Sequence, residues 1–141
     1  RIVVILGDNI IRDDIAPYVR KFESQDSGAR ILLKQVEDPQ RFGVPELDGE
    51  RIVRIEEKPL EPASNYAVTG IYMYDRRVFD FIRRLKPSGR GELEITDVNN
   101  QYIREGDLFY DVLEGWWTDA GTFESLFHAG ALVAADRTAA T

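Results

Sequence analysis

The chain has 141 residues, of which 18 are Lys or Arg and 25 are Asp or Glu, so its formal net charge is −7. That length suits one domain with a sizeable core, and 43% hydrophobic with 30% charged residues is ordinary for a soluble globular protein. The absence of cysteine excludes disulfides, iron–sulfur clusters, thiolate zinc sites and cysteine nucleophiles. The net acidity argues against a nucleic acid polymer or an anionic membrane as partner. No apolar run reaches the roughly 18 residues that would span a bilayer.

The first apolar segment, from Ile2 to Leu6, ends at Gly7. A continuous apolar run of this length is typical of a strand that is covered on both faces. No basic, apolar and small-residue leader comes before it, and we expect a cytoplasmic protein. A chain that starts at Arg1, directly ahead of a core strand, is expected to be a portion of a larger domain.

Extended and helical patterns alternate along the rest of the chain. Asp13 and Asp14 can cap a helix from about Ile15 to Ser24, in whose first turn Pro17 is tolerated. Further strands are predicted at residues 29–36, 42–47, 52–58, 66–74 and 108–113. Further helices are predicted at residues 78–85 and 93–105 and from residue 122, where one face carries Phe123, Leu126, Phe127 and Ala131.

This alternation predicts an α/β fold. One hairpin is set among the other elements, because Asp48-Gly49 between two short strands is a turn signal. We therefore expect a mixed, mostly parallel sheet flanked by helices. The small and polar tail from Ala134 to Thr141 is predicted to be frayed.

Two aspartates are candidate metal ligands. Asp8 follows the first predicted strand, and ligands collect beyond the carboxyl ends of strands in open α/β sheets. Carboxylate oxygens suit Mg²⁺, which takes one or two carboxylates together with substrate phosphates. The alternative for Gly7-Asp8-Asn9 is a simple turn. Asp119 could supply a second carboxylate to the same metal or cap the last helix, for which Thr122 is an equally good cap.

Glu57 and Lys58 lie at the end of a predicted strand and ahead of Pro59. Lysine supplies charge to a phosphate and glutamate accepts hydrogen bonds from hydroxyls, so the pair could hold a phosphorylated polyol. Pro59 favours an extended Lys58. Side chains of an extended segment alternate between faces, so the pair points one way only if the strand bends or bulges. The alternative is a solvated charge cluster.

Arg90 stands between two glycines, which let the backbone approach a ligand while the guanidinium holds a phosphate. The alternative is a flexible loop ahead of a helix start, where Glu92 and Glu94 only complement the helix dipole. His128 is the only histidine and is predicted to lie mid-helix, so Ser-His-Asp chemistry has no support. The dinucleotide and P-loop fingerprints do not occur.

In their order along the chain, six segments resemble the sugar-nucleotidyltransferase family, and in particular its thymidylyltransferase branch. The resemblance extends from about Ile2 to Ala135. Its segments are Leu6-Gly7-Asp8-Asn9, Arg41-Phe42-Gly43-Val44, Glu56-Glu57-Lys58-Pro59, Ser64-Asn65-Tyr66-Ala67-Val68-Thr69-Gly70-Ile71-Tyr72, Gly91-Glu92-Leu93-Glu94-Ile95-Thr96-Asp97 and Trp117-Thr118-Asp119-Ala120-Gly121-Thr122.

The resemblance implies a Rossmann-like nucleotidyltransferase fold and a Mg²⁺-dependent reaction. In that reaction a phosphate oxygen of glucose 1-phosphate attacks the α-phosphorus of dTTP, which gives dTDP-glucose for deoxysugar pathways and releases pyrophosphate. Because the attacking oxygen is already anionic, the reaction requires no strong general base.

The resemblance also implies roles for the candidate residues. Asp8 and Asp119 would hold the Mg²⁺. Lys58 and Arg90 would bind the phosphate of the sugar and aim its oxygen. Glu57 would accept hydrogen bonds from the sugar hydroxyls. The other members of the implied sugar pocket are the backbone at Gly43 and Val68 and, as a weaker candidate, Tyr72.

Two departures from the family pattern stand out. Ala120 replaces a more usual Thr beside Asp119 and leaves the carboxylate in place. The family's glycine-rich loop for the triphosphate and its base-reading segment belong ahead of Arg1. The resemblance thus implies that residues 1–135 are the C-terminal portion of the domain, with an incomplete dTTP site, and that 136–141 are a frayed tail.

We expect this portion to be inactive alone and its full-length parent to be a homo-oligomer. The alternatives are a non-catalytic sugar-phosphate-binding or regulatory module and a uridylyltransferase of the same family.

Overall fold

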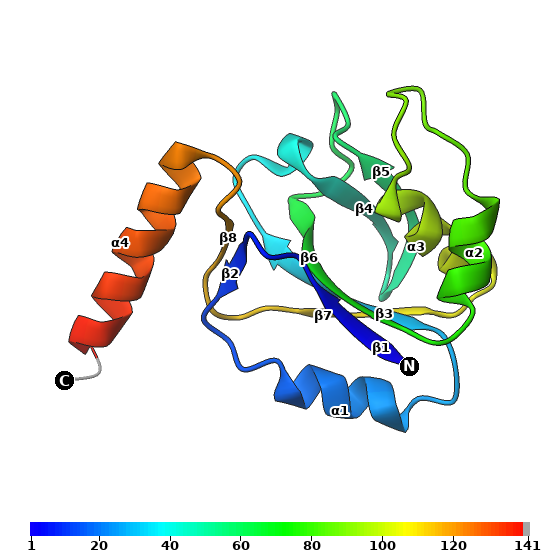
Figure 1. The fold of residues 1–141 in the computed structure, drawn as a ribbon, viewed down its shortest axis with the longest axis horizontal. Coiled ribbons are helices and arrows are strands. Elements are labelled where there is room, and N and C mark those ends of the chain that lie inside the picture. The colour runs from blue at the N-terminus through cyan, green and yellow to red at the C-terminus, as the bar shows by residue number, and fades with distance from the viewer. Residues whose placement is uncertain (140–141) are drawn as a thin grey trace.

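The structure is a computed structural model of the chain, and it describes residues 1–139. A four-stranded sheet in the order β1-β6-β3-β7 forms its centre (Figure 1). The sheet strands are β1 (Ile2–Ile5), β3 (Ala29–Gln35), β6 (Tyr66–Tyr74) and β7 (Leu108–Val112). The other elements are β2 (Asn9–Ile11), α1 (Ala16–Ser24), the 3₁₀ turn η1 (Pro39–Arg41), β4 (Gly43–Asp48), β5 (Arg51–Glu57), α2 (Val78–Arg84), α3 (Ile95–Arg104), β8 (Trp117–Asp119) and α4 (Phe123–Ala139).

The central sheet is mixed, as predicted. β1, β3 and β7 run in one direction, whereas β6 runs against them and lies between β1 and β3. Most strands therefore share one direction, as predicted. Most neighbouring strands nevertheless pair antiparallel, which was not predicted. Among the described residues, β3 with β7 is the single parallel pair of this sheet, because the reversed β6 separates β3 from β1.

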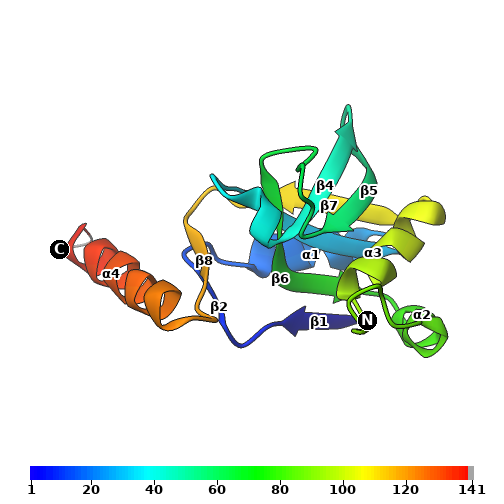
Figure 2. The same ribbon diagram turned by 90° about the horizontal axis from the view of Figure 1, so that it is seen from above.

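Helices cover both faces of the sheet, as Figures 1 and 2 show together. On one face, Tyr72 and Tyr74 of β6 share a core with residues of α2, α3 and β5. On the other face, Ile71 and Met73 share a second core with Phe22 of α1. Every residue of β6 after the first is buried, so β6 is the strand that is covered on both faces.

β1 was predicted to be covered on both faces, and that prediction is wrong for the described chain. Ile2 and Val4 pack against the core, whereas Val3 is 41% and Ile5 50% exposed. β1 is an edge strand of the sheet, where alternating side chains bury one face only.

The predicted hairpin is confirmed as β4 and β5, which pair antiparallel from Gly43 opposite Glu57 to Asp48 opposite Arg51. The pair of β2 and β8 was not predicted. Each is three residues long and lies in a segment rich in turn-forming residues, so no alternation could reveal it. This short ladder pairs Asn9 with Asp119 and so brings two distant candidate segments together.

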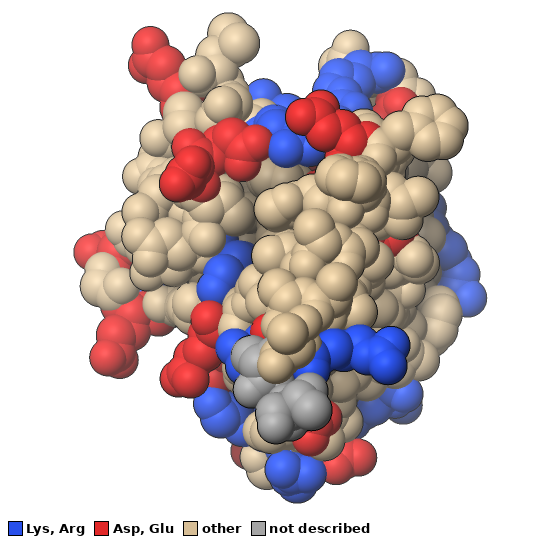
Figure 3. Space-filling model, turned by 90° about the vertical axis from the view of Figure 1, so that its left-hand side faces the viewer, with Lys and Arg blue, Asp and Glu red and all other residues tan. Residues whose placement is uncertain are grey.

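The last helix is confirmed, but its predicted apolar face is not covered by any described element. Phe123 is 95%, Phe127 82% and Leu126 53% exposed. α4 stands apart from the sheet in Figures 1 and 2, and Figure 3 shows a broad uncharged surface on this side of the molecule. α4 extends into the segment that was predicted to be frayed, as far as Ala139, and alanine favours helix. Residues 140 and 141 lie outside the described residues.

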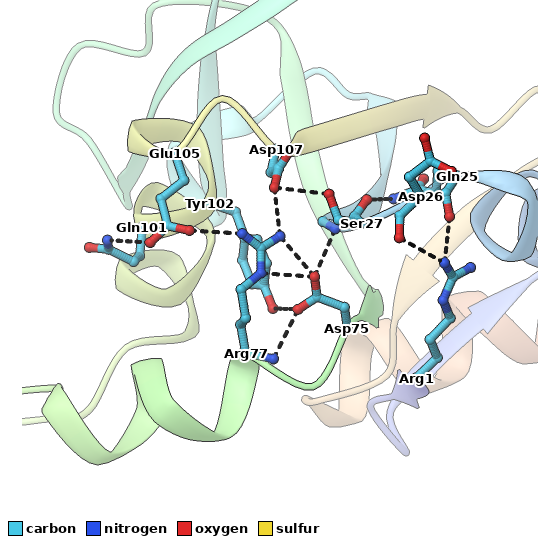
Figure 4. Close-up of polar contacts among 11 residues, drawn as sticks. Arg1, Gln25, Asp26, Ser27, Asp75, Arg77, Gln101, Tyr102, Glu105 and Asp107 are labelled. Carbon is cyan, nitrogen blue, oxygen red and sulfur yellow. Dashed lines mark hydrogen bonds and ion pairs between the residues drawn. The ribbon is translucent and has the colours of Figure 1, made fainter.

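An ionic cluster around Arg77 joins the start of β3, the end of β6 and the loop after α3 (Figure 4). Arg77 donates hydrogen bonds to Asp75, Glu105 and Asp107 at 2.9, 2.9 and 2.6 Å. Burial by itself raises the pKa of Asp75, but hydrogen bonds from the Arg77 side chain and from nearby backbone N–H groups outweigh it. The resulting pKa of Asp75 is about 2.

Candidate active site

Seven of the eight predicted site residues line one pocket of about 250 Å³. The pocket lies beyond the end of β1, between the open end of the β4–β5 hairpin, the start of α3 and β8. Its lining comprises Leu6, Asp8, Asn9, Arg41, Phe42, Gly43, Glu57, Lys58, Val68, Gly70, Tyr72, Ile95, Thr96, Asn99, Trp117 and Asp119. A larger cavity of about 520 Å³ beside β7 contains none of the predicted site residues, so chemistry rather than size selects this pocket.

The carboxylates of Asp8 and Asp119 both lie close to Gly121. A Cβ atom placed on Gly121 would be 3.4 Å from Oδ2 of Asp8 and 3.8 Å from Oδ2 of Asp119. The β2–β8 ladder fixes this approach, and the N–H of Ala120 donates to the backbone oxygen of Asp8 at 2.6 Å. Both carboxylates therefore border the same pocket, as the predicted metal site requires.

The donor set fits a divalent cation. The pocket lining carries three carboxylates, those of Asp8, Glu57 and Asp119, against two basic side chains, those of Arg41 and Lys58. Polyanionic substrates would meet net negative charge there unless a cation were present. Two carboxylates together with phosphate oxygens are the usual ligands of Mg²⁺. Within residues 1–139, no cluster of three or more His, Cys, Asp or Glu side chains suits a metal.

Asn9 holds the Asp8 carboxylate in place, a role that the sequence analysis missed. Its Nδ2 donates to Oδ1 of Asp8 at 2.9 Å, and its Oδ1 accepts from the N–H of Gly70 at 2.8 Å and from Nε1 of Trp117 at 2.7 Å. A Cβ on Gly70 would lie 2.5 Å from Asn9 Nδ2, so this contact requires glycine. The signal in the sequence was Asn9 itself, which was interpreted only as a turn residue.

Glu57 and Lys58 both line the pocket, because the chain turns sharply between them. Lys58 has a φ of 46°, and among the described residues it alone has a positive φ without being glycine. The expected extended conformation of Lys58 is therefore wrong. Its N–H donates to the carbonyl of Phe42 at 2.9 Å, a tertiary contact that overrides the preference of a residue before Pro59.

The part of the pocket around Glu57 and Tyr72 is polar on one wall and aromatic on another. Oε2 of Glu57 accepts a hydrogen bond from Thr96 at 2.6 Å, and a Cβ on Gly43 would lie 3.3 Å from the same oxygen. Tyr72 is 5% exposed. Burial first, and then the charges of Glu57 and Asp8, raise the pKa of Tyr72, so its phenol stays neutral and can donate.

Arg90 is the one predicted site residue that does not line this pocket. It borders a neighbouring cavity that shares Glu57 and Thr96 with the first. Its guanidinium lies 3.8 Å from Glu57, 3.7 Å from Glu94 and 3.2 Å from Glu92. The structure thus places Arg90 at the rim, held by acidic neighbours.

The pocket also contains Arg41 and Trp117, which the sequence analysis did not assign to the site. Arg41 lies 3.7 Å from Oδ1 of Asp119, and it is also paired with Asp38 at 2.8 Å. The rings of Phe42 and Trp117 meet edge to face at 5.1 Å and close one wall. Arg41 and Trp117 both belong to segments that resemble the family, and this resemblance is the signal that could have assigned them to the site.

Comparison with known proteins shows the family to which the chain belongs. A family model described as nucleotidyl transferase matches residues 1–136. The chain therefore belongs to the nucleotidyl transferase family. It is 44% identical over 136 residues to a glucose-1-phosphate thymidylyltransferase of Neisseria meningitidis, a match that covers 94% of this chain. It is 43% identical over 137 residues to the low-salt glycan biosynthesis nucleotidyltransferase of Haloferax volcanii, with 96% covered.

Solved structures show the same relationship. A crystal structure described as that of a glucose-1-phosphate thymidylyltransferase from Bacillus anthracis, in complex with sucrose, superposes with a TM-score of 0.87 at 61% identity over 92% of this chain. A UDP-glucose pyrophosphorylase with bound UDP-glucose superposes at 0.80 over 95% of this chain, with 20% identity, and shares the fold. The Rossmann-like nucleotidyltransferase fold is thereby confirmed.

The chain spans only part of these proteins. It covers 47% of the Neisseria relative, 38% of the Haloferax relative and 53% of the Bacillus chain. Among residues 1–139, no helix is long and apolar enough to cross a membrane.

Proposed function

We propose that this chain supplies the sugar-phosphate and metal side of a glucose-1-phosphate thymidylyltransferase. The observation that carries the proposal is the convergence of Asp8, Asp119 and the adjacent pair Glu57 and Lys58, from three separate segments, on one pocket. The names of the Neisseria and Bacillus relatives support the substrate assignment. Glucose 1-phosphate and dTTP are the proposed substrates, and dTDP-glucose and pyrophosphate the proposed products.

Asp8 and Asp119 are the residues that would hold Mg²⁺. A bound Mg²⁺ at these carboxylates would neutralise charge on the α-phosphate and on the departing pyrophosphate. Asn9 keeps the Asp8 carboxylate oriented through its amide, and the β2–β8 ladder keeps Asp119 opposite Asn9. The cation is a proposal that rests on the donor set.

Lys58 and Glu57 would orient the sugar phosphate. The Lys58 ammonium attracts the phosphate, and the Glu57 carboxylate accepts hydrogen bonds from ring hydroxyls. A phosphate oxygen of the sugar forms the new bond to the α-phosphorus of dTTP as the bond to the pyrophosphate oxygen breaks. That oxygen is anionic at neutral pH, so the residues around it need only position it and balance charge.

The triphosphate-binding residues are proposed to belong to the part of the longer enzyme that this chain does not cover. We therefore expect the 141-residue chain alone to bind glucose 1-phosphate but to form no dTDP-glucose. The cytoplasmic location and the homo-oligomeric state remain predictions of the same kind.

A binding experiment tests the sugar side directly. Isothermal titration of the chain with glucose 1-phosphate, in the presence of Mg²⁺, should show tighter binding than titration with glucose or inorganic phosphate. Equal affinity for all three would contradict the proposed function. Activity is tested in a chimera in which this chain replaces the segment that it matches in the Bacillus relative. A chimera that binds the sugar phosphate but never turns over would favour the non-catalytic module.

A further inference from the structure

Asn99 lies in the wall of the pocket and is 1% exposed. It stands on α3 three residues after Thr96, so both side chains leave the same face of the helix. Thr96 already donates to Glu57, which places Asn99 next to the polar wall of the proposed sugar site. The apolar core that α3 covers does not require a polar side chain at Thr96 or at Asn99.

The amide of Asn99 is only half used. Its Oδ1 accepts a hydrogen bond from the hydroxyl of Tyr74 at 2.7 Å. Its Nδ2 is, among the described residues, the one buried side-chain nitrogen or oxygen without a hydrogen-bond partner. A buried donor without a partner costs about 1–3 kcal/mol, and such groups are rare in folded proteins.

The neighbouring Asn100 shows how a purely structural amide is used on the same helix. Its Nδ2 donates to the carbonyl of Ile55 at 2.8 Å, and its Oδ1 accepts from the N–H of Ile55 at 2.9 Å. Thr69, another fully buried polar residue, donates to the carbonyl of Leu32. The unpaired group therefore occurs at the amide that borders the pocket and not at these two.

We propose that Asn99 is a specificity-determining residue, whose Nδ2 donates a hydrogen bond to a hydroxyl oxygen of the sugar ring in the pocket. This inference rests on the proposed function, because it requires the pocket to hold a sugar phosphate. The sugar hydroxyl would supply the hydrogen-bond acceptor that Asn99 Nδ2 lacks within the protein. An analogue without that hydroxyl would leave Nδ2 unpaired. Discrimination among sugars would follow from this cost.

The test compares Asn99→Ala with Tyr74→Phe in the 141-residue chain. Both substitutions remove the hydrogen bond between Asn99 and Tyr74, but only the first removes Nδ2, and Tyr74 does not line the pocket. We expect Asn99→Ala to weaken binding of glucose 1-phosphate about three- to tenfold and to leave binding of inorganic phosphate unchanged. Tyr74→Phe should bind both within about twofold of the original chain.

A series of monodeoxy analogues of glucose 1-phosphate identifies the hydroxyl. One analogue should bind the original chain about three- to tenfold more weakly and bind Asn99→Ala with no further loss. If every analogue binds the original chain as tightly as glucose 1-phosphate does, the inference is wrong, even if no Asn99 variant folds. Equal losses in Asn99→Ala and Tyr74→Phe would show a structural role instead. Failure of the original chain to prefer glucose 1-phosphate over phosphate would overturn the proposed function itself.

Discussion

Lys58 carries its side chain into the pocket from the left-handed region of backbone conformation, with a φ of 46°. For a residue with a Cβ, this region costs about 1–2 kcal/mol. The conformation persists because the N–H of Lys58 bonds to Phe42 and because Glu57 pairs with Gly43 across the hairpin. Strain that surrounding contacts maintain is typical of functional sites.

Replacing Lys58 by glycine tests this strain. Because glycine adopts a positive φ without a steric penalty, Lys58→Gly should raise the free energy of unfolding by about 1 kcal/mol. Urea denaturation measures the change. A destabilisation by Lys58→Gly would show that the lysine side chain itself supports the fold.

Lys58→Ala tests the charge at the same position. The alanine keeps the Cβ and removes the ammonium, so the affinity for glucose 1-phosphate should fall at least about tenfold, while stability stays nearly unchanged. Lys86→Ala is the matched control, since Lys86 lies outside the pocket, at the end of α2. If the two variants bind alike, Lys58 does not contact the phosphate.

At this scale the sequence revealed the residue types but not all of their conformations. Asp8, Asp119, Glu57 and Lys58 were candidates from their places at the ends of predicted strands or ahead of a helix, and the family resemblance implied their roles. The local rule for a residue before proline failed at Lys58, because its N–H donates a hydrogen bond to the carbonyl of Phe42, just ahead of β4, in a tertiary contact that local sequence does not show. Asn9 and Asn99 could not be assigned, since their roles depend on contacts across the fold.

At the scale of elements, the long strands and helices follow from their patterns. Alternation and continuous apolar runs identified β3, β6 and the β4–β5 hairpin to within two residues. β2 and β8 escaped prediction because three residues carry no periodicity, and their pairing is stabilised by the contacts of Asn9 and Ala120. These short strands bring the two proposed metal carboxylates together. The β2–β8 pair thus matters most to the site, although its sequence carries the weakest signal of secondary structure.

Substitution of one phenylalanine on α1 and one on α4 tests how much each helix contributes to the stability of the fold. Phe22 on α1 is 2% exposed and packs with Leu32 and Met73, whereas Phe127 on α4 is 82% exposed. Phe22→Ala should cost about 3–5 kcal/mol of unfolding free energy, because it leaves a cavity. Phe127→Ala should change stability by less than about 0.5 kcal/mol.

Urea denaturation of both phenylalanine variants measures these changes in the 141-residue chain. A large loss in Phe127→Ala would show that α4 packs against a surface of the molecule or of a second copy.

At the scale of the whole molecule, acid stability depends on the cluster around Arg77. Asp75 has a pKa of about 2 in the fold, against an ordinary value of 3.8, so ionisation of Asp75 favours folding. Its contribution is fully present above about pH 4 and is lost as the pH falls toward 2. Asp75→Asn should therefore be less stable than the original chain at pH 7, and the difference should shrink below pH 4.

Denaturant titrations of both chains at several pH values between 7 and 2.5 check this expectation. A difference in stability that does not change with pH would mean that the Asp75 pKa is ordinary in the folded chain.

We propose above that this chain provides the metal carboxylates of a nucleotidyl transfer reaction. The most direct measurement is the rate of dTDP-glucose formation, with Mg²⁺, by the chimera that carries this chain within the Bacillus relative. Asp8→Asn and Asp119→Asn should each lower kcat by about 100-fold or more, while glucose 1-phosphate still binds. Rates within about threefold of the parent chimera in either variant would contradict the assignment of that carboxylate.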